Sequence, residues 1–119
     1  MAEHNDLGKK GEELAVDFLL NKGYAILQTN YTFQKAEIDI IAQIGNTLAV
    51  VEVKTRTSNA MGNPQEFVNK KKIQLLVKAI NNYVIDNNLD VNVRFDIIAV
   101  LFTKNEPTIE HIEDAFYYF

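Results

Sequence analysis

The stretch from Glu37 to Lys54 reads EIDIIAQIGNTLAVVEVK, and it sets the centre of the expected fold. Its two halves are rich in β-branched residues and alternate in polarity, which predicts strands over Glu37–Gln43 and Thr47–Lys54. The intervening Gly45-Asn46 predicts a tight hairpin turn. The two strands are therefore expected to be antiparallel neighbours.

Two acids lie inside these strands, although acidic side chains are rare in strands and costly to bury. The hairpin register predicts Asp39 directly opposite Glu52, with Cβ atoms about 5 Å apart, and Glu37 opposite Lys54. Strand alternation also sorts the side chains by face. On the first strand Glu37, Asp39 and Ile41 are expected to share a face, and on the second Leu48, Val50, Glu52 and Lys54.

Two facing carboxylates repel each other, so this position calls for a cation. Hard divalent ions such as Mg²⁺ or Mn²⁺ prefer oxygen ligands, which predicts a metal site at Asp39 and Glu52 with Lys54 within reach. The alternative is a solvent-exposed face on which Glu37 and Lys54 form an ordinary ion pair. Val50, beside Glu52, argues against a fully wet face.

Elements before the hairpin follow from periodicity and end signals. Apolar residues at helical spacing predict a helix over Asp6–Asn21, closed by Gly23. A strand is expected over Tyr24–Thr29, and Asn30–Ala36 is either a loop or an extension of that strand.

Elements after the hairpin alternate between helix and strand. The polar Thr55–Asn63 predicts a loop that leads into a second helix, with a break near Asn69 and an end at Asn87-Asn88. Strands are expected over Val93–Phe102 and Ile109–Glu113. The order α-β-β-β-α-β, with a further short strand, predicts an α/β fold. Its mixed sheet is flanked by helices, and the crossover helix returns the fourth strand parallel to a neighbour.

Composition bounds the class of protein. A length of 119 residues predicts a single domain, 1–119, and 47% apolar with 24% charged residues is ordinary for a soluble globule. The chain has no cysteine, which excludes disulfides and thiolate metal sites. No apolar run spans a membrane and no signal peptide is evident, so a cytoplasmic protein is expected. The net charge of −4 argues against a non-specific nucleic-acid coat.

Four sequence blocks together closely resemble the YraN-like family: Gly8–Ala15 (GKKGEELA), Glu37–Ile41, Val50–Arg56 (VVEVKTR) and Gly62–Lys72. The Asp39 and Glu52-Val53-Lys54 pattern also resembles the bipartite D…ExK motif of the PD-(D/E)XK nuclease superfamily. Within that superfamily the YraN-like family is similar to archaeal Holliday-junction resolvases. The resemblance covers nearly the whole chain and implies a restriction-endonuclease-like fold.

The resemblance also implies roles in phosphodiester hydrolysis. Asp39, Glu52 and the carbonyl of Val53 would ligate Mg²⁺ or Mn²⁺, and Lys54 would position or polarise the attacking water. Glu12 lies at the edge of the apolar stripe of the first helix, where the family has a functional glutamate, so it is expected to be a further ligand or catalytic acid. The alternative for Glu12 is a first-turn acid favoured by the helix dipole.

Candidate nucleic-acid contacts lie around this centre. Arg56 and Lys72 are expected to contact phosphates, and Lys72 matches the lysine of the family's second helix. Tyr31 and Lys35 precede the Asp39 strand and are candidates for contact with nucleic acid, with packing as the alternative. Asp96 is expected to be structural, and no role is assigned to His111.

The expected function is metal-dependent phosphodiester hydrolysis of nucleic acid, with structured DNA as the substrate. The resemblance to junction resolvases, which pair up, implies a homodimer. The alternative is a non-catalytic nucleic-acid-binding or adaptor module that keeps the nuclease fold. A third reading is a structural protein with an exposed charged sheet face.

Overall fold

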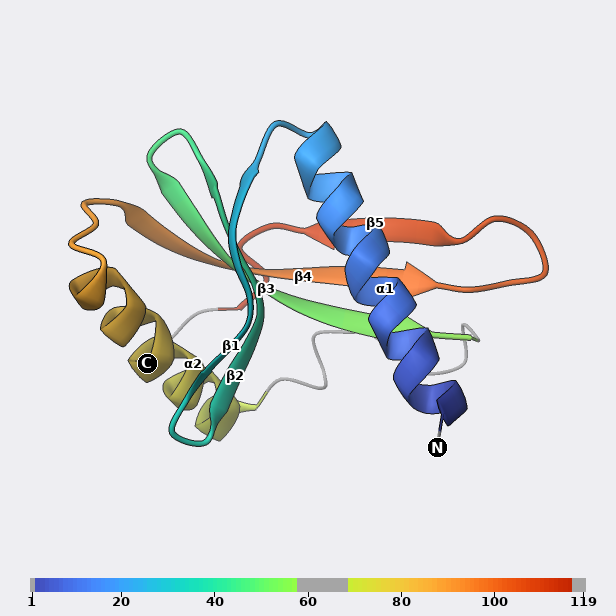
Figure 1. Cartoon of the computed structure of the whole chain (residues 1–119), viewed down its shortest axis with the longest axis horizontal. Coiled ribbons are helices and arrows are strands. Elements are labelled where there is room, and N and C mark those ends of the chain that lie inside the picture. The colour runs from blue at the N-terminus through green and yellow to red at the C-terminus, as the bar shows by residue number, and fades with distance from the viewer. Residues whose placement is uncertain (1, 58–68, 117–119) are drawn as a thin grey trace.

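A mixed sheet of five strands, covered by a helix on each face, makes up the computed structural model, which describes residues 2–57 and 69–116 (Figure 1). The strands lie in the order β1-β2-β3-β4-β5. In chain order the elements are α1 (Ala2–Asn21), β1 (Ala25–Phe33), β2 (Ala36–Ile44), β3 (Thr47–Arg56), α2 (Lys70–Asp86), β4 (Asn92–Leu101) and β5 (Thr108–Ile112). The predicted α/β arrangement is confirmed.

Helix α1 ends where the sequence predicts. Gly23 has a left-handed φ of 99°, and the N–H of Tyr24 donates to the carbonyl of Leu19, a Schellman closure that glycine permits. Its start differs from the prediction, because the helix extends to Ala2 instead of beginning at Asp6. Apolar periodicity marks only the turns that pack on the sheet, so it could not place the first turn.

The edge strand β1 is longer and less regular than expected. It reaches Phe33, so most of the Asn30–Ala36 stretch extends the strand. Its pairing with β2 shifts by one residue between Ile26 and Gln28, and Asn30 has a left-handed φ of 52°. Bulges of this kind bend an edge strand and discourage pairing with another chain.

Helix α2 returns the chain to a strand parallel to β3. Asn69, where a break was expected, is the N-cap, and its side-chain oxygen accepts the N–H of Lys72 at 2.8 Å. The C-cap is Asn87, as predicted. Residues 58–68, which include the predicted helix start, lie outside the described residues. β4 then runs parallel to β3, and β5 runs antiparallel to β4.

Two apolar layers hold the helices to the sheet. The layer beneath α2 includes Ile41, Leu48, Val50, Leu76 and Ile80. The layer beneath α1 includes Leu19, Ile40, Val51, Ile98 and Val100. Complete burial of an aliphatic side chain of this size contributes about 1.5–3 kcal/mol. Within the described part of the chain, no helix is both long enough and apolar enough to cross a membrane.

Candidate active site

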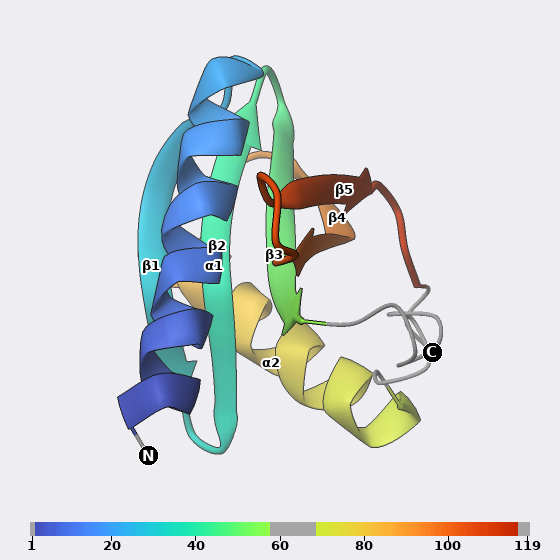
Figure 2. The ribbon, with the colours of Figure 1, turned by 90° about the vertical axis from the view of Figure 1, so that its right-hand side faces the viewer.

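The candidate site lies where the strands β2 and β3 stop pairing. Their ladder has the predicted register from Ile44–Thr47 to Ile40–Val51 and stops there. Figure 2 shows the two strands diverging beyond the hairpin. Asp39 therefore does not enter the expected ladder position opposite Glu52. Oδ2 of Asp39 instead accepts a hydrogen bond from the N–H of Val53 at 2.8 Å. The carboxylate thus takes the place of a backbone carbonyl of β2 as the acceptor for β3.

The predicted faces of β2 need one correction. Asp39 and Ile40 both line a cavity against α1, whereas Ile38 and Ile41 both belong to the layer beneath α2. Ile41 therefore does not share the face of Asp39, and strict alternation fails between Asp39 and Ile40. β2 leaves β3 at this point and faces Asn30 of irregular β1, so neither neighbour holds it to a regular pleat.

Glu52 is buried, and its carboxylate contacts two ammonium groups. Its Oε2 lies 3.3 Å from Nζ of Lys54 and 2.5 Å from Nζ of Lys72 at the start of α2. The prediction that Glu37 lies opposite Lys54 was wrong. β2 and β3 no longer pair at that level, Glu37 is exposed, and Lys54 contacts Glu52.

Burial dominates the electrostatics of this site. Burial and the charge of Glu52 raise the pKa of Asp39 to about 7, against the hydrogen bond from Val53. Burial also lowers the pKa of Lys54, and the ammonium of Lys72 adds to this effect against the attraction of Glu52. The site therefore holds a carboxyl and an amine that are both displaced toward their neutral forms.

Glu12 approaches the same site from α1. It lines a cavity of about 260 Å³ together with Thr29, Asn30 and Asp39. Burial and the charges of Glu37 and Glu52 raise the pKa of Glu12, against a hydrogen bond from Asn30. Glu12, at the edge of the apolar stripe of α1, thus lies close enough to Glu52 for the two charges to interact.

The predicted nucleic-acid contacts lie in different places. Arg56 ends β3 and donates to the carbonyl of Thr55 at 2.9 Å. Tyr31 packs edge-on against Tyr83 beneath α2, and its hydroxyl accepts a hydrogen bond from Asn82, an arrangement that matches the packing alternative. Lys35 lies in the exposed β1–β2 turn. Lys72 contacts Glu52 of the candidate site.

The donors at this site fit a magnesium-type ion with open coordination positions. Among the described side chains, no three acidic or histidine residues come together in a group that could hold a metal ion. Mg²⁺ typically takes one or two carboxylates and completes its shell with water and substrate phosphate. Asp39 and Glu52 could supply two oxygen ligands. The carbonyl of Val53 points to the same side of β3 as its N–H, which faces Asp39, and could supply a third.

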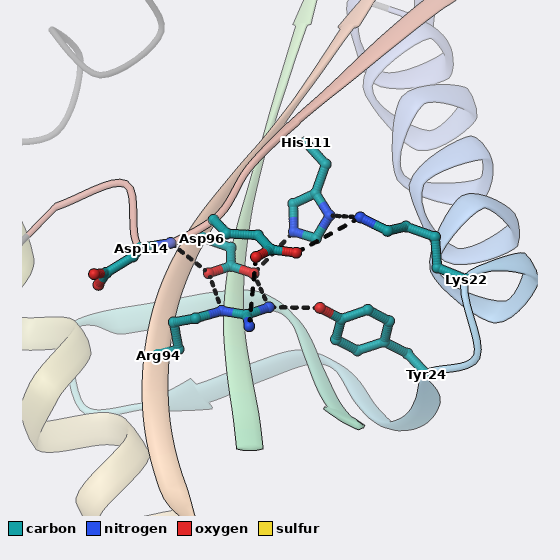
Figure 3. Close-up of polar contacts among 7 residues, drawn as sticks. Lys22, Tyr24, Arg94, Asp96, His111 and Asp114 are labelled. Atoms are coloured by element: carbon teal, nitrogen blue, oxygen red, sulfur yellow. Dashed lines mark hydrogen bonds and ion pairs between the residues drawn. The ribbon is translucent and has the colours of Figure 1, made fainter. Parts of the chain in front are cut away.

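A second polar cluster lies around Asp96 on β4 and β5 (Figure 3). Asp96 is fully buried and accepts hydrogen bonds from Arg94, from the N–H of Asp114, and from Nε2 of His111 at 2.8 Å. Arg94 also contacts the hydroxyl of Tyr24. The structural role expected for Asp96 agrees with this network. The sequence assigned His111 no role because it lies 15 residues from Asp96, and only the pairing of β4 with β5 brings the two together.

The contacts of His111 identify its tautomer. Nζ of Lys22 lies 2.9 Å from its Nδ1, and a lysine ammonium can only donate. Nδ1 must therefore be the acceptor, which leaves the proton on Nε2 to be donated to Asp96. The imidazole is neutral in this arrangement and links α1 to β4 and β5.

Comparison with known proteins supplies the family context. The model of the "Uncharacterised protein family UPF0102" matches residues 11–100. A UPF0102 protein of Flavobacterium psychrophilum is 67% identical over 119 residues, and one of Christiangramia forsetii is 63% identical, each over the full length of both chains. A UPF0102 protein of Thermodesulfovibrio yellowstonii is 46% identical over 112 residues, covering 94% of this chain and 96% of that relative.

Proposed function

This chain belongs to the uncharacterised protein family UPF0102, and from its site we propose that it is a Mg²⁺- or Mn²⁺-dependent phosphodiesterase acting on nucleic acid, with structured DNA as the preferred substrate. The observation that carries the proposal is the bond from Val53 to Asp39, which holds one acid beside β3 next to Glu52 and Lys54. The β2–β3 ladder ends here, beside two carboxylates, and departures from regular structure of this kind are expected at functional sites.

Each side chain of the site would have a separate role in hydrolysis. Asp39 and Glu52 would hold the divalent ion, which supplies Lewis-acid stabilisation of the charge that develops on phosphate. Lys54, largely buried and with a lowered pKa, would orient the attacking water and offset that charge. Glu12 would contact ion-bound water from the α1 side.

Lys72 would bind the scissile phosphate or its neighbour. Its side chain is 36% exposed, so the ammonium can turn from Glu52 toward an anionic ligand. Lys70, Lys71 and Lys72 fill the first turn of α2, which has no acidic residue. Three cations at a helix N-terminus oppose the macrodipole and cost stability, so a role in anion binding accounts for their placement better than folding does.

The second candidate is a nucleic-acid-binding module without catalysis. The observation in its favour is that two ammonium groups already contact Glu52, so this acid is compensated without a metal. The two candidates differ in what a divalent ion does, because only the phosphodiesterase requires one.

The test is a cleavage panel. Linear, single-stranded, nicked and four-way DNA, and RNA, are incubated with the protein and Mg²⁺, Mn²⁺ or EDTA. We expect metal-dependent cleavage of at least one DNA form, a loss of about 10²-fold or more in Asp39→Asn and Lys54→Met, and no loss in Asp90→Asn, an exposed acid beyond α2. Binding without cleavage in every condition would support the module instead.

A further inference from the structure

Helix α1 packs directly against Thr55 of β3 at Gly11. A Cβ atom built on Gly11 would lie 2.1 Å from Oγ1 of Thr55 and 3.2 Å from its Cβ and Cγ2. Non-bonded carbon contacts lie near 3.5–4.0 Å, so no side chain fits here without movement. Gly11 has no left-handed backbone, in contrast to Gly23 and Gly45. Space, not conformation, is what requires glycine at this position.

The neighbouring residues give this contact a consequence for the site. Glu12 follows Gly11, and Thr55 follows Lys54. The contact therefore joins the turn of α1 that carries Glu12 to the part of β3 that carries Glu52 and Lys54. To reach an ordinary distance of 3.4 Å, the added Cβ and Oγ1 of Thr55 must separate by more than 1 Å, through movement of the helix, of β3 or of the Thr55 side chain. The part of this separation taken up by the helix would carry the carboxyl of Glu12 away from Asp39, with which it shares a cavity.

Gly8 supplies an internal comparison on the same helix. A Cβ atom at Gly8 would meet nothing within 4 Å. Both glycines weaken a helix relative to alanine, yet only the one at Gly11 is needed for close packing.

We propose that Gly11 and Thr55 form a spacing contact that sets the distance between Glu12 and the acids of the sheet, which makes Gly11 a positioning residue of the metal site. This inference rests on the proposed function, since it gives Glu12 a part in metal binding. The contact acts through the placement of Glu12 alone.

The test measures Mn²⁺ affinity of the full chain by titration, alongside thermal unfolding. Gly11→Ala is expected to weaken Mn²⁺ binding about tenfold, the scale at which supporting residues affect metal sites. Gly8→Ala should leave the affinity unchanged. The double variant Gly11→Ala/Thr55→Gly should recover most of the affinity because the three atoms nearest to the new Cβ all belong to the Thr55 side chain.

Two further variants separate positioning from a general packing effect. If Gly11 acts through Glu12, Gly11→Ala should have no added effect on Mn²⁺ affinity in a Glu12→Gln background. Glu12→Asp withdraws the carboxyl by one methylene with the helix contact intact, and should weaken Mn²⁺ binding as Gly11→Ala does. This variant keeps the inference testable even if Gly11→Ala does not fold.

The outcomes also separate this inference from the proposed function. A wild type that binds Mn²⁺ and cleaves DNA, with Gly11→Ala and Glu12→Asp both binding Mn²⁺ equally well, would overturn the positioning role alone. An equal loss from Gly11→Ala with and without Glu12 would overturn it too. A wild type that neither binds Mn²⁺ nor cleaves would remove both the function and the inference.

Discussion

Lys72 of α2 places its ammonium nitrogen 2.5 Å from Oε2 of Glu52 on β3. Lys72 thus contacts Glu52, the acid that the D…ExK pattern predicts to be a metal ligand. Lys54 contacts the same oxygen at 3.3 Å. A divalent ion at Glu52 would therefore have to compete with two ammonium groups, and we expect its affinity to depend on the position of Lys72.

Removal of Lys72 is expected to tighten metal binding in the absence of nucleic acid. In Lys72→Met the competing charge is lost while most of the side-chain volume remains, so Mn²⁺ affinity should rise about tenfold, equivalent to about 1.4 kcal/mol. Calorimetric titration of the protein without DNA measures this change. Lys71→Met is the matched control, because Lys71 is exposed one residue away. An unchanged or weaker affinity in Lys72→Met would mean that Lys72 does not compete with the ion.

Asp39→Asn is expected to stabilise the protein in EDTA and to abolish its response to Mg²⁺. Burial and Glu52 raise the pKa of Asp39 to about 7, so the ionised carboxylate destabilises the fold. Because the pKa of Asp39 is higher in the folded than in the unfolded state, the neutral carboxyl contributes to the free energy of unfolding. This contribution is lost as pH rises from about 4 to about 7. At pH 8 the asparagine variant should gain roughly 1–3 kcal/mol in the free energy of unfolding.

The measurement is urea unfolding at pH 8, with and without Mg²⁺. Asparagine can still accept the N–H of Val53, so the backbone contact is preserved. Mg²⁺ should raise the midpoint of the wild type and not that of the variant. Equal shifts in both proteins would argue against an ion bound at Asp39.

Much of the fold was predictable because its signals are local. The turn at Gly45-Asn46 determines the register of β2 and β3, and the apolar stripe of α2 marks the helix from Ile73 to Val84. The separation of β2 from β3 at Asp39 was not predictable. Alternation assumes a continuous ladder, and nothing local in EIDII signals that the ladder ends in a side-chain contact with Val53.

The motif names the residues of the candidate site, but it does not give the contacts that they make. Lys72 was predicted to contact phosphate, and it contacts Glu52, because the distance between residues 20 positions apart depends on how α2 packs. The constraint at Gly11 was missed for a similar reason. It depends on Thr55, which tertiary structure alone brings to the helix.

The cluster around Asp96 predicts how the protein responds to acid. Burial alone would raise the pKa of Asp96, but hydrogen bonds from His111, Arg94 and the N–H of Asp114 outweigh it and hold the pKa below its ordinary value. A depressed carboxyl pKa contributes stability that is present above the unfolded value near 4 and is lost as pH falls through the folded value.

Asp96→Asn should therefore destabilise the protein by about 3–5 kcal/mol at pH 7, because it leaves Arg94 without its buried partner. The difference between variant and wild type should shrink as pH falls from 5 to 3, measured by urea unfolding. Asp90→Asn, an exposed acid, should show little difference at any pH. A constant gap between Asp96→Asn and wild type over this range would mean that ionisation of Asp96 is not the source of the stability.

His111 is expected to hold its proton on Nε2 at neutral pH. Lys22 can only donate to Nδ1, and Asp96 accepts from Nε2, so both contacts favour the same neutral tautomer. The chain has two histidines, so ¹⁵N NMR of a His4→Gln variant reports on His111 alone. In Lys22→Met the contact at Nδ1 is lost while Asp96 remains, and the Nε2–H tautomer should persist with a shifted Nδ1 resonance. A proton found on Nδ1 in the wild type at pH 8 would show that the ammonium of Lys22 does not donate to this ring.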